Sequence, residues 1–478
     1  MSLARKAVKN GVWFAIFKSV SQVLSWGVTI VVARILSPAD YALSAMATLI
    51  TGYAEIFSEM GIGASIIQKK TQTQRDLSSI FWFALGVSCL FALACFPISY
   101  LTAHIFNEPR VIPLVQAVSV LFIFTGLQVV PLSLLKRDLD YKTIGIIEMQ
   151  STTISCLCMV GIAYFDGGVW TLIGGRIIRG GVRLVLVYRA TKWKPDIYYN
   201  YAQAKDYLQF GIVVAFSSSV FYIFEMSDRF FAGRAWPLEV LGYYLLAMQL
   251  AKMPMDKIVS TINNVTYSLF SRYQDDREKF IEYYLKTIKL TSVLVFPIFV
   301  GGFVFAERIV PLLLGEKWIP MIALFKFLCL VQIITSLNAI VSYVHMALGY
   351  PSRGAVFYGA CALLMSISFY FAVDYEKEMI LIPWFTTYVI LSVAWIVYTN
   401  IKLGIGGANY LRSIVWPSLA SLAMFMLIYV IRSVDILVGF SSYFLIIVEV
   451  FIAVVTYLLV LWIFDKETLL SIKSWRKS

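Results

Sequence analysis

The sequence predicts an all-α, polytopic membrane protein with about fourteen transmembrane helices. Three observations lead to this fold class: an apolar composition, apolar runs of about twenty residues, and loops that alternate between high and low Lys and Arg content. Of the 478 residues, 60% are hydrophobic and only 14% are charged, whereas soluble chains carry about 25% charged residues. Lipid accepts such apolar surface and water does not, so a soluble fold is excluded.

The apolar runs define the elements, because about twenty such residues cross a bilayer as a helix. Trp and Tyr recur near the ends of the runs, where amphipathic rings suit the membrane interface. The run after the basic N-terminal residues is too long for a signal peptide and is expected to stay as the first span. The predicted spans lie near residues 11–34, 38–66, 79–105, 111–134, 142–165, 168–190, 206–232, 239–268, 286–306, 319–348, 354–373, 379–401, 409–431 and 441–464.

The Lys and Arg residues of the loops predict the orientation of these spans. The loops on one side, together with both termini, hold about twenty-five Lys and Arg residues, and the loops on the other side hold about seven. Cytoplasmic loops are the ones enriched in positive charge. Both termini are therefore predicted to be cytoplasmic, which requires an even number of spans.

Several functional classes are excluded or disfavoured by residues that the chain lacks or scatters. The net charge of +12 is spread over short loops and does not form the basic face that nucleic-acid binding needs. The six cysteines lie inside apolar runs and offer no metal-ligand spacing. Phosphate-binding loops, ATPase motifs and hydrolase motifs are absent from the sequence, and the loops on the low-charge side are short. We therefore expect neither an enzyme nor a cofactor or metal site.

The longest hydrophilic connections, 189–205 and 269–285, suggest how the spans are grouped. We expect an N-terminal six-helix lobe at 1–192, a cytoplasmic linker at 193–205, a second six-helix lobe at 206–402, and spans thirteen and fourteen with a tail at 403–478. Two six-helix repeats are a common transporter plan. A weak internal similarity between residues 38–41 and 237–240, each a proline followed by an acid that opens a helix, agrees with it.

Ionisable residues inside the predicted spans are the functional candidates, because a charge in the bilayer is costly. Depth from the cytoplasmic ends predicts two ion pairs, Lys18 with Glu59 and Glu148 with Arg183, each as compatible with a structural role as with the lining of a wet cavity. The remaining charges lie mostly in spans two, six, seven, eight and ten. They are Glu55, Arg176, Arg179, Glu225, Asp228, Arg229, Lys252, Asp256, Lys257 and Lys326, with His345 near a cytoplasmic end as an ordinary polar residue and Glu449 alone in span fourteen.

Arg176, Arg179 and Arg183 form a stripe on one face of span six, at i, i+3 and i+7. Glu148 is expected to neutralise one of them, and three guanidiniums cannot face lipid. The guanidiniums of this stripe must then contact protein, water or an anion. Snorkelling to the headgroups would suffice only for Arg183, so a cationic functional face is the favoured interpretation.

Span eight carries a proline among charges, Lys252-Met253-Pro254-Met255-Asp256-Lys257. Pro254 removes a backbone donor, so the helix is expected to kink or open there. A broken helix with charges at mid-membrane is a pointer to a transporter's binding site, although a kink needed only for packing would look the same. Lys252 and Asp256 lie one turn apart and are expected to compensate each other in part.

These charges predict a site for an anionic or phosphate-bearing substrate. The candidate binding cations are Lys252, Lys257, Arg229, Arg179, Arg176 and Lys18. The candidates for ion pairing or ion coupling are Glu55, Glu59, Asp256, Glu225 and Asp228.

Five segments resemble motifs of the Wzx-type polysaccharide and oligosaccharide flippases, in the multidrug/oligosaccharidyl-lipid/polysaccharide exporter superfamily. They are 31–41 (VVARILSPADY), 59–68 (EMGIGASIIQ), 241–244 (LGYY), 270–276 (FSRYQDD) and 311–318 (PLLLGEKW). The resemblance covers residues 1–350, and the colanic-acid-exporter-like group is the most similar branch. Ala42 departs from the usual glycine without consequence for function.

The resemblance implies two six-helix lobes around a central cavity, two further C-terminal helices, and alternating access in a bacterial inner membrane. The implied substrate is an oligosaccharide repeat unit on a polyprenyl pyrophosphate, moved from the cytoplasmic to the periplasmic leaflet for surface polysaccharide biosynthesis. The expected partners are this lipid-linked oligosaccharide, the phospholipid bilayer and a polysaccharide polymerase, with no nucleic acid. A multidrug/cation antiporter of the same superfamily is the alternative, against which Lys18 counts because such antiporters carry acids in span one. A membrane enzyme is the third interpretation.

Overall fold

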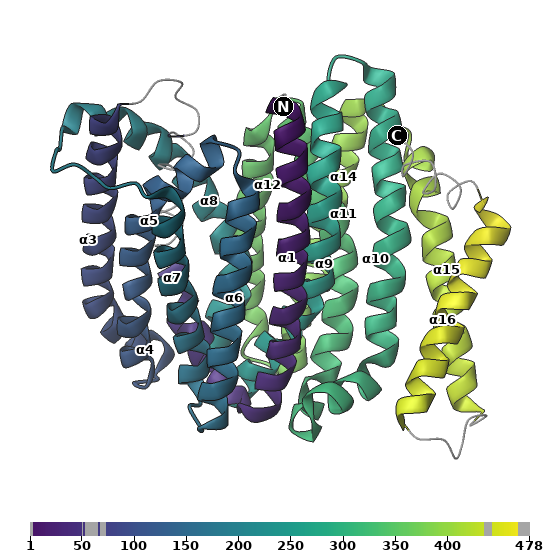
Figure 1. Ribbon diagram of the computed structural model, residues 1–478. Coiled ribbons are helices and arrows are strands. Elements are labelled where there is room, and N and C mark those ends of the chain that lie inside the picture. Colours follow the sequence, from purple (N-terminus) through teal and green to yellow (C-terminus); the bar gives the residue numbers. More distant parts are fainter. Residues whose placement is uncertain (1–2, 50, 53–65, 67–72, 435–441, 467–478) are drawn as a thin grey trace. The chain divides into compact units, whose positions relative to one another are not determined.

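The computed structural model describes residues 3–49, 51–52, 66, 73–434 and 442–466, without the side chains of 3–9, 202–217, 260, 264–265 and 442–443. Throughout these residues the chain forms helices joined by short connections, and no strand occurs in them (Figure 1). Residues 38–49 are helical. The other helices are α1 (Leu3–Ile35), α3 (Gln74–Phe106), α4 (Val111–Val118), α5 (Val120–Arg137), α6 (Tyr141–Tyr164), α7 (Val169–Thr191), α8 (Tyr201–Ala235), α9 (Leu238–Arg272), α10 (Arg277–Leu314), η1 (Glu316–Met321), α11 (Ile322–Ala347), α12 (Pro351–Ala372), η2 (Lys377–Ile380), α13 (Leu381–Phe385), α14 (Thr387–Leu403), α15 (Gly407–Ser433) and α16 (Ser442–Phe464).

The all-α, polytopic fold class is confirmed. Within the described residues, ten helical segments are long and apolar enough to cross a membrane. The helices α7, α8 and α9 are also long enough, with 23, 35 and 35 residues, and they carry many of the intramembrane charges. The remaining predicted span, 38–66, is helical in its first part and otherwise lies largely outside the described residues.

Acidic side chains open several helices, as the sequence predicts for Asp40. The backbone N–H of Ser37 donates to Asp40 Oδ2 at 2.9 Å, and the backbone N–H of Asp40 donates back to Ser37 Oγ at 3.3 Å. Thr73 and Asp76 form the same reciprocal capping box at the start of α3. Each box satisfies backbone donors that have no partner within the helix, which is why the helices begin at these residues.

The expected opening of the helix at Pro254 is wrong. The helix α9 runs without interruption from Leu238 to Arg272, with Pro254 inside it. Prolines also lie inside α3, α5, α10 and α15, because a long helix in a packed bundle tolerates the loss of one backbone hydrogen bond. Interruptions within predicted spans do occur at Ser119, between α4 and α5, and at Thr386, between α13 and α14, where φ is −108° and ψ is −80°.

The chain divides into two compact units, residues 1–242 and 243–478, with the boundary inside α9. The expected division into six-helix lobes at 1–192 and 206–402 stays a prediction. The first part of the expected linker is bound to α3: Trp82 Nε1 donates to the carbonyl of Asp196 at 2.8 Å, and Trp193 Nε1 donates to Gln74 Oε1 at 2.9 Å. Residues 193–196 therefore form a strap on the N-terminal turns of α3.

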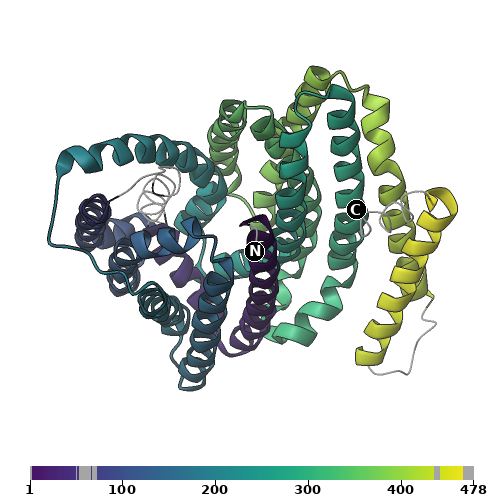
Figure 2. The same cartoon turned by 45° about the horizontal axis from the view of Figure 1, so that its top comes forward.

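In the second unit, α15 and α16 form a hairpin beside α10 (Figures 1 and 2). Buried apolar side chains of the three helices, among them Phe305, Met424 and Leu461, form one cluster. Tyr457 donates its hydroxyl to the carbonyl of Val293 at 2.8 Å. The two C-terminal helices are thus packed on α10 along their length.

Candidate functional site

Two glycines of α7 allow this helix to pack closely against α5 and α6. A Cβ added at Gly175 would meet the side chain of Met159 on α6, and one at Gly180 would meet Phe124 on α5. Ser155 Oγ on α6 also donates to the carbonyl of Gly175 at 2.7 Å. Around the helix the three arginines lie between Gly175 and Gly180, so the stripe is on the side of α7 that packs against α5 and α6.

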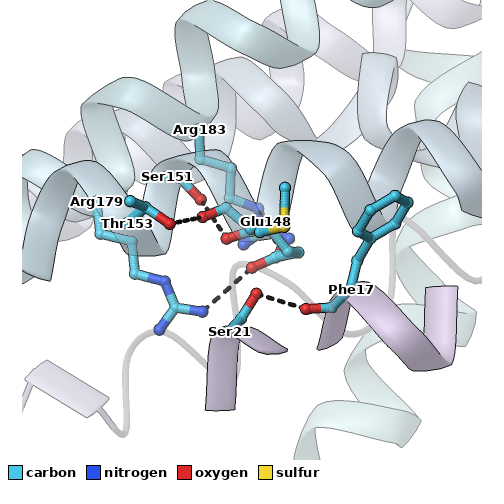
Figure 3. Close-up of polar contacts among 8 residues, drawn as sticks. Phe17, Ser21, Glu148, Ser151, Thr153, Arg179 and Arg183 are labelled. Atoms are coloured by element: carbon cyan, nitrogen blue, oxygen red, sulfur yellow. Dashed lines mark hydrogen bonds and ion pairs between the residues drawn. The ribbon is translucent and has the colours of Figure 1, made fainter. Parts of the chain in front are cut away.

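Glu148 on α6 binds two arginines of the stripe (Figure 3). Arg179 Nη2 donates to Glu148 Oε2 at 3.1 Å, and Arg183 Nε lies 3.1 Å from Oε1. The predicted Glu148–Arg183 pair is confirmed. Glu148 contacts two arginines, because Arg179 and Arg183 are one helical turn apart and reach the two oxygens of one carboxylate. Its single negative charge still neutralises only one of them, as expected.

This cluster of Glu148, Arg179 and Arg183 carries a formal charge of +1, from two guanidiniums and one carboxylate. The side chain of Glu148 is 21% exposed and that of Arg183 is 26% exposed, but that of Arg179 is 53% exposed. Arg176, one turn before Arg179, is also exposed. The uncompensated charge therefore lies at the accessible end of the stripe, where an anion can reach it.

The helix α1 packs directly against α6 beside this cluster. A Cβ at Gly145 would meet the backbone of Phe14 and the side chain of Phe17, and Figure 3 draws Phe17 and Ser21 near Glu148. Lys18 on the same helix is exposed, with its Nζ 5.9 Å from the ring centroid of Phe14. Its expected partner Glu59, like Glu55, lies outside the described residues.

Arg229 on α8 is the second candidate cation of the first unit. Its Nη1 donates to the sulfur of Met226 at 3.3 Å, and its Nε is buried without a hydrogen-bond partner among the described residues. Asp228 is 1% exposed, and its Oδ1 accepts from the backbone N–H of Arg229 at 2.7 Å. Glu225 is half-buried on the same helix. A guanidinium with a buried, unsatisfied donor is suited to a polar ligand.

The other candidate charges belong to the second unit, on α9. Lys252 and Lys257 are half-buried and Asp256 is exposed. These three residues lie on one continuous helix, so the structure does not support a binding site built on an unwound segment at Pro254. Lys252 and Lys257 remain predicted binding cations, and Asp256 remains a predicted ion-pairing or ion-coupling residue.

Sequence reasoning missed a charge cluster in the second unit. Glu449 on α16, expected to stand alone, is 1% exposed and lies 2.7 Å from Arg308 Nη1 on α10 and 2.9 Å from Arg432 Nη2 on α15. Both arginines had been assigned to loops. Matching of depths does not find Arg432–Glu449, because Glu449 lies seven residues after the start of α16 at Ser442, whereas Arg432 is next to the last residue of α15.

Two further intramembrane groups of the second unit are engaged within the protein. Lys326 on α11 lies 2.7 Å from Glu307 on α10. His345, expected to be an ordinary polar residue, is 1% exposed, bonds Thr399 at 2.8 Å and stacks on Trp395 at a centroid distance of 4.4 Å. Across the described residues, no group of three or more His, Cys, Asp or Glu side chains could hold a metal ion.

Comparisons with known proteins identify the family and the fold of this chain. Residues 31–323 match the family described as "Polysaccharide biosynthesis protein". The lipopolysaccharide biosynthesis protein WzxC of Escherichia coli is 28% identical over 71% of this chain and 69% of its own length. Among solved structures, the inward closed lipid II flippase MurJ superposes with a TM-score of 0.79 at 14% identity, over 96% of this chain and all of that one. An inward-facing multidrug resistance MATE transporter gives 0.66 at 14% identity, over 80% of this chain and 94% of that one; at such identities both show the fold alone.

Proposed function

Because the chain belongs to the polysaccharide biosynthesis protein family, we propose that it is a flippase for lipid-linked oligosaccharide repeat units. It moves an oligosaccharide carried on a polyprenyl pyrophosphate between the leaflets of the membrane, for assembly of a surface polysaccharide. WzxC is named for lipopolysaccharide biosynthesis and MurJ for flipping lipid II. A sugar carried on a lipid phosphate fits both names, and its phosphate is a group that the cationic cluster can bind.

The observation that carries the proposal is the cluster of Glu148, Arg179 and Arg183. An arginine pair with an excess charge of +1 is costly in a membrane-spanning helix unless it serves an anion or lines water. Guanidinium groups present paired donors that match phosphate oxygens. Arg179 supplies the accessible charge, since its side chain is 53% exposed.

Glu148 acts as a positioning residue in this proposal. Its carboxylate holds Arg179 and Arg183 at 3.1 Å each, which limits their rotamers before substrate arrives. Binding therefore loses less side-chain entropy than it would with two free arginines. The carboxylate also moderates the charge, so that a pyrophosphate binds weakly enough to be released on the other side of the membrane.

The other predicted intramembrane charges also have roles in this proposal. We propose that Arg176, Arg229 and Lys18 extend the cationic lining in the N-terminal lobe, and that Lys252 and Lys257 supply it in the C-terminal lobe. Asp256, Glu225, Asp228, Glu55 and Glu59 then form the ion pairs or the ion-coupling groups. Unchanged export by the Lys252→Ala and Lys257→Ala variants at normal abundance would remove the second lobe from this site.

Loss of the gene tests the function directly. We expect a deletion strain to stop exporting its surface polysaccharide while still making the lipid-linked repeat unit, which accumulates on the cytoplasmic side. The measurement is surface polysaccharide together with extracted lipid-linked oligosaccharide, in a strain lacking related flippases. Unimpaired export would refute the proposal, and a drug-efflux defect with normal export would favour the antiporter, whose fold this chain shares. Loss of the lipid-linked unit itself would indicate an enzyme.

We place the protein in the bacterial inner membrane with both termini in the cytoplasm, next to the polymerase that would use the translocated unit. The asymmetry of Lys and Arg between alternate loops supports this orientation. Reporter fusions after residues 200 and 275 should report the cytoplasm, and those near 108 and 236 the periplasm. A periplasmic signal at 275 would contradict the order of spans in the second half of the chain.

A further inference from the structure

The two arginines at Glu449 are not equivalent. Arg432 uses every nitrogen of its guanidinium inside the protein: Nε and Nη2 donate to Glu449 Oε2 at 3.3 and 2.9 Å, and Nη1 donates to the carbonyl of Val304 at 2.8 Å. Arg308 has its Nη1 2.7 Å from Oε1 of the carboxylate, but this buried Nη1 makes no hydrogen bond within the described residues. Glu449 is its only ion-pair partner in the described part of the chain. Arg432 and Glu449 therefore form a closed neutral pair, and Arg308 is the surplus cation.

The nearest other charges do not cancel this surplus. Glu307, next to Arg308 in α10, is bound by Lys326 at 2.7 Å, so these two also form a neutral pair. Taken together, Arg308, Arg432 and Lys326 supply three positive charges, and Glu307 and Glu449 supply two negative ones. The group carries a net charge of +1 in a region where α10, α15 and α16 are otherwise apolar.

The surplus charge lies at the edge of a lipid-facing surface. The side chain of Arg308 is 30% exposed, and α15 carries the exposed Tyr429 (64%) one turn before Arg432. Arg308 lies six residues before the end of α10 at Leu314, about 9 Å along the helix at 1.5 Å per residue. A long arginine side chain at this depth reaches the headgroup level of a leaflet.

We propose that Arg308 binds the phosphate group of an anionic membrane lipid. With Nη1 in contact with Glu449, the Nε and Nη2 donors remain as one bidentate edge, which matches two phosphate oxygens. A bound phosphate neutralises the surplus charge, and the exposed side chain of Tyr429, one turn before Arg432 on α15, offers apolar surface for an acyl or prenyl chain. This site belongs to the C-terminal hairpin and α10, and it is separate in sequence from the arginine stripe of α7.

The test is lipid binding by the purified full-length chain in phosphatidylcholine nanodiscs. One arm titrates phosphatidylglycerol and the other titrates undecaprenyl phosphate, and native mass spectrometry counts the bound lipids. We expect Arg308→Gln to weaken binding of the recognised lipid at least tenfold. We expect Arg308→Lys to weaken it severalfold, because lysine keeps the positive charge but lacks the paired N–H donors of a guanidinium. Lys377→Gln removes a cation from the connection between α12 and α13 and should leave binding unchanged.

The two arms identify the source of the phosphate. Weakened binding of phosphatidylglycerol assigns the site to phospholipid, weakened binding of undecaprenyl phosphate alone assigns it to a polyprenyl carrier, and weakening in both arms supports a site for lipid phosphate in general. Wild-type affinity for both lipids in Arg308→Gln overturns the proposal. If that variant does not fold, wild-type affinity in Arg308→Lys overturns it instead.

Discussion

Replacing Arg179 by Gln removes the accessible charge of the cluster while keeping a polar side chain of similar length. A hydrogen bond to a charged group contributes about 1.5–3 kcal/mol. The lower figure applies here, because the Arg179 side chain is 53% exposed and water screens its interaction with an anion. At about 1.4 kcal/mol per factor of ten, we expect transport to fall about tenfold.

The assay is surface polysaccharide in a deletion strain complemented with each variant, normalised to the amount of protein in the membrane. Arg189→Gln is the matched control, since it removes the same charge from an exposed position near the end of the same helix, and it should export normally. Arg179→Lys should recover part of the activity, because lysine restores the charge without the bidentate geometry.

One outcome would refute the reasoning. If Arg179→Gln exports at the wild-type level and normal abundance, the arginine stripe does not bind the substrate. The Glu148, Arg179 and Arg183 cluster would then be a structural tie between α6 and α7. A fall in abundance that accounts for the whole loss of export would lead to the same conclusion.

Two other substitutions test how the helices are held together. Glu449→Gln leaves two guanidiniums without their carboxylate. This costs about 3 kcal/mol, the lower end for a broken buried pair, because both arginines are about a quarter exposed. We expect a lower thermal melting temperature in detergent, and an unchanged one would show that the pair contributes nothing to stability. Gly242→Ala places a Cβ against the backbone carbonyl of Pro38, so the protein should lose abundance in the membrane. Gly161→Ala, which has open space around it, should not, and equal abundance of the two variants would contradict the close approach at Gly242.

The sequence predicts the spans well because each transmembrane helix satisfies its own backbone hydrogen bonds and its length follows from bilayer thickness. These are local properties, readable along the chain. Helix starts are local too, as the boxes at Ser37–Asp40 and Thr73–Asp76 demonstrate. The Glu148–Arg183 pair was predictable from sequence because the two residues lie on consecutive helices at matched depth.

Pairings that depend on how helices rotate against one another were beyond the sequence. Glu449 appeared to be alone because its partner Arg308 is 141 residues away on α10, and only packing brings those helices together. The sharing of Glu148 between Arg179 and Arg183 depends on how α7 is rotated toward α6.

Helix breaks were also not predictable from single residues, as Pro254 shows. The residue itself favours a break in the helix, but α9 continues through it, whereas the chain does break at Thr386, where the sequence analysis expected one continuous span. What the sequence by itself determined is thus which segments cross the membrane and which charges they carry, because hydropathy and capping act within one segment. Which charges meet, and which are left for a ligand, was decided by the tertiary structure, because an ion pair needs two helices at the right depth and rotation.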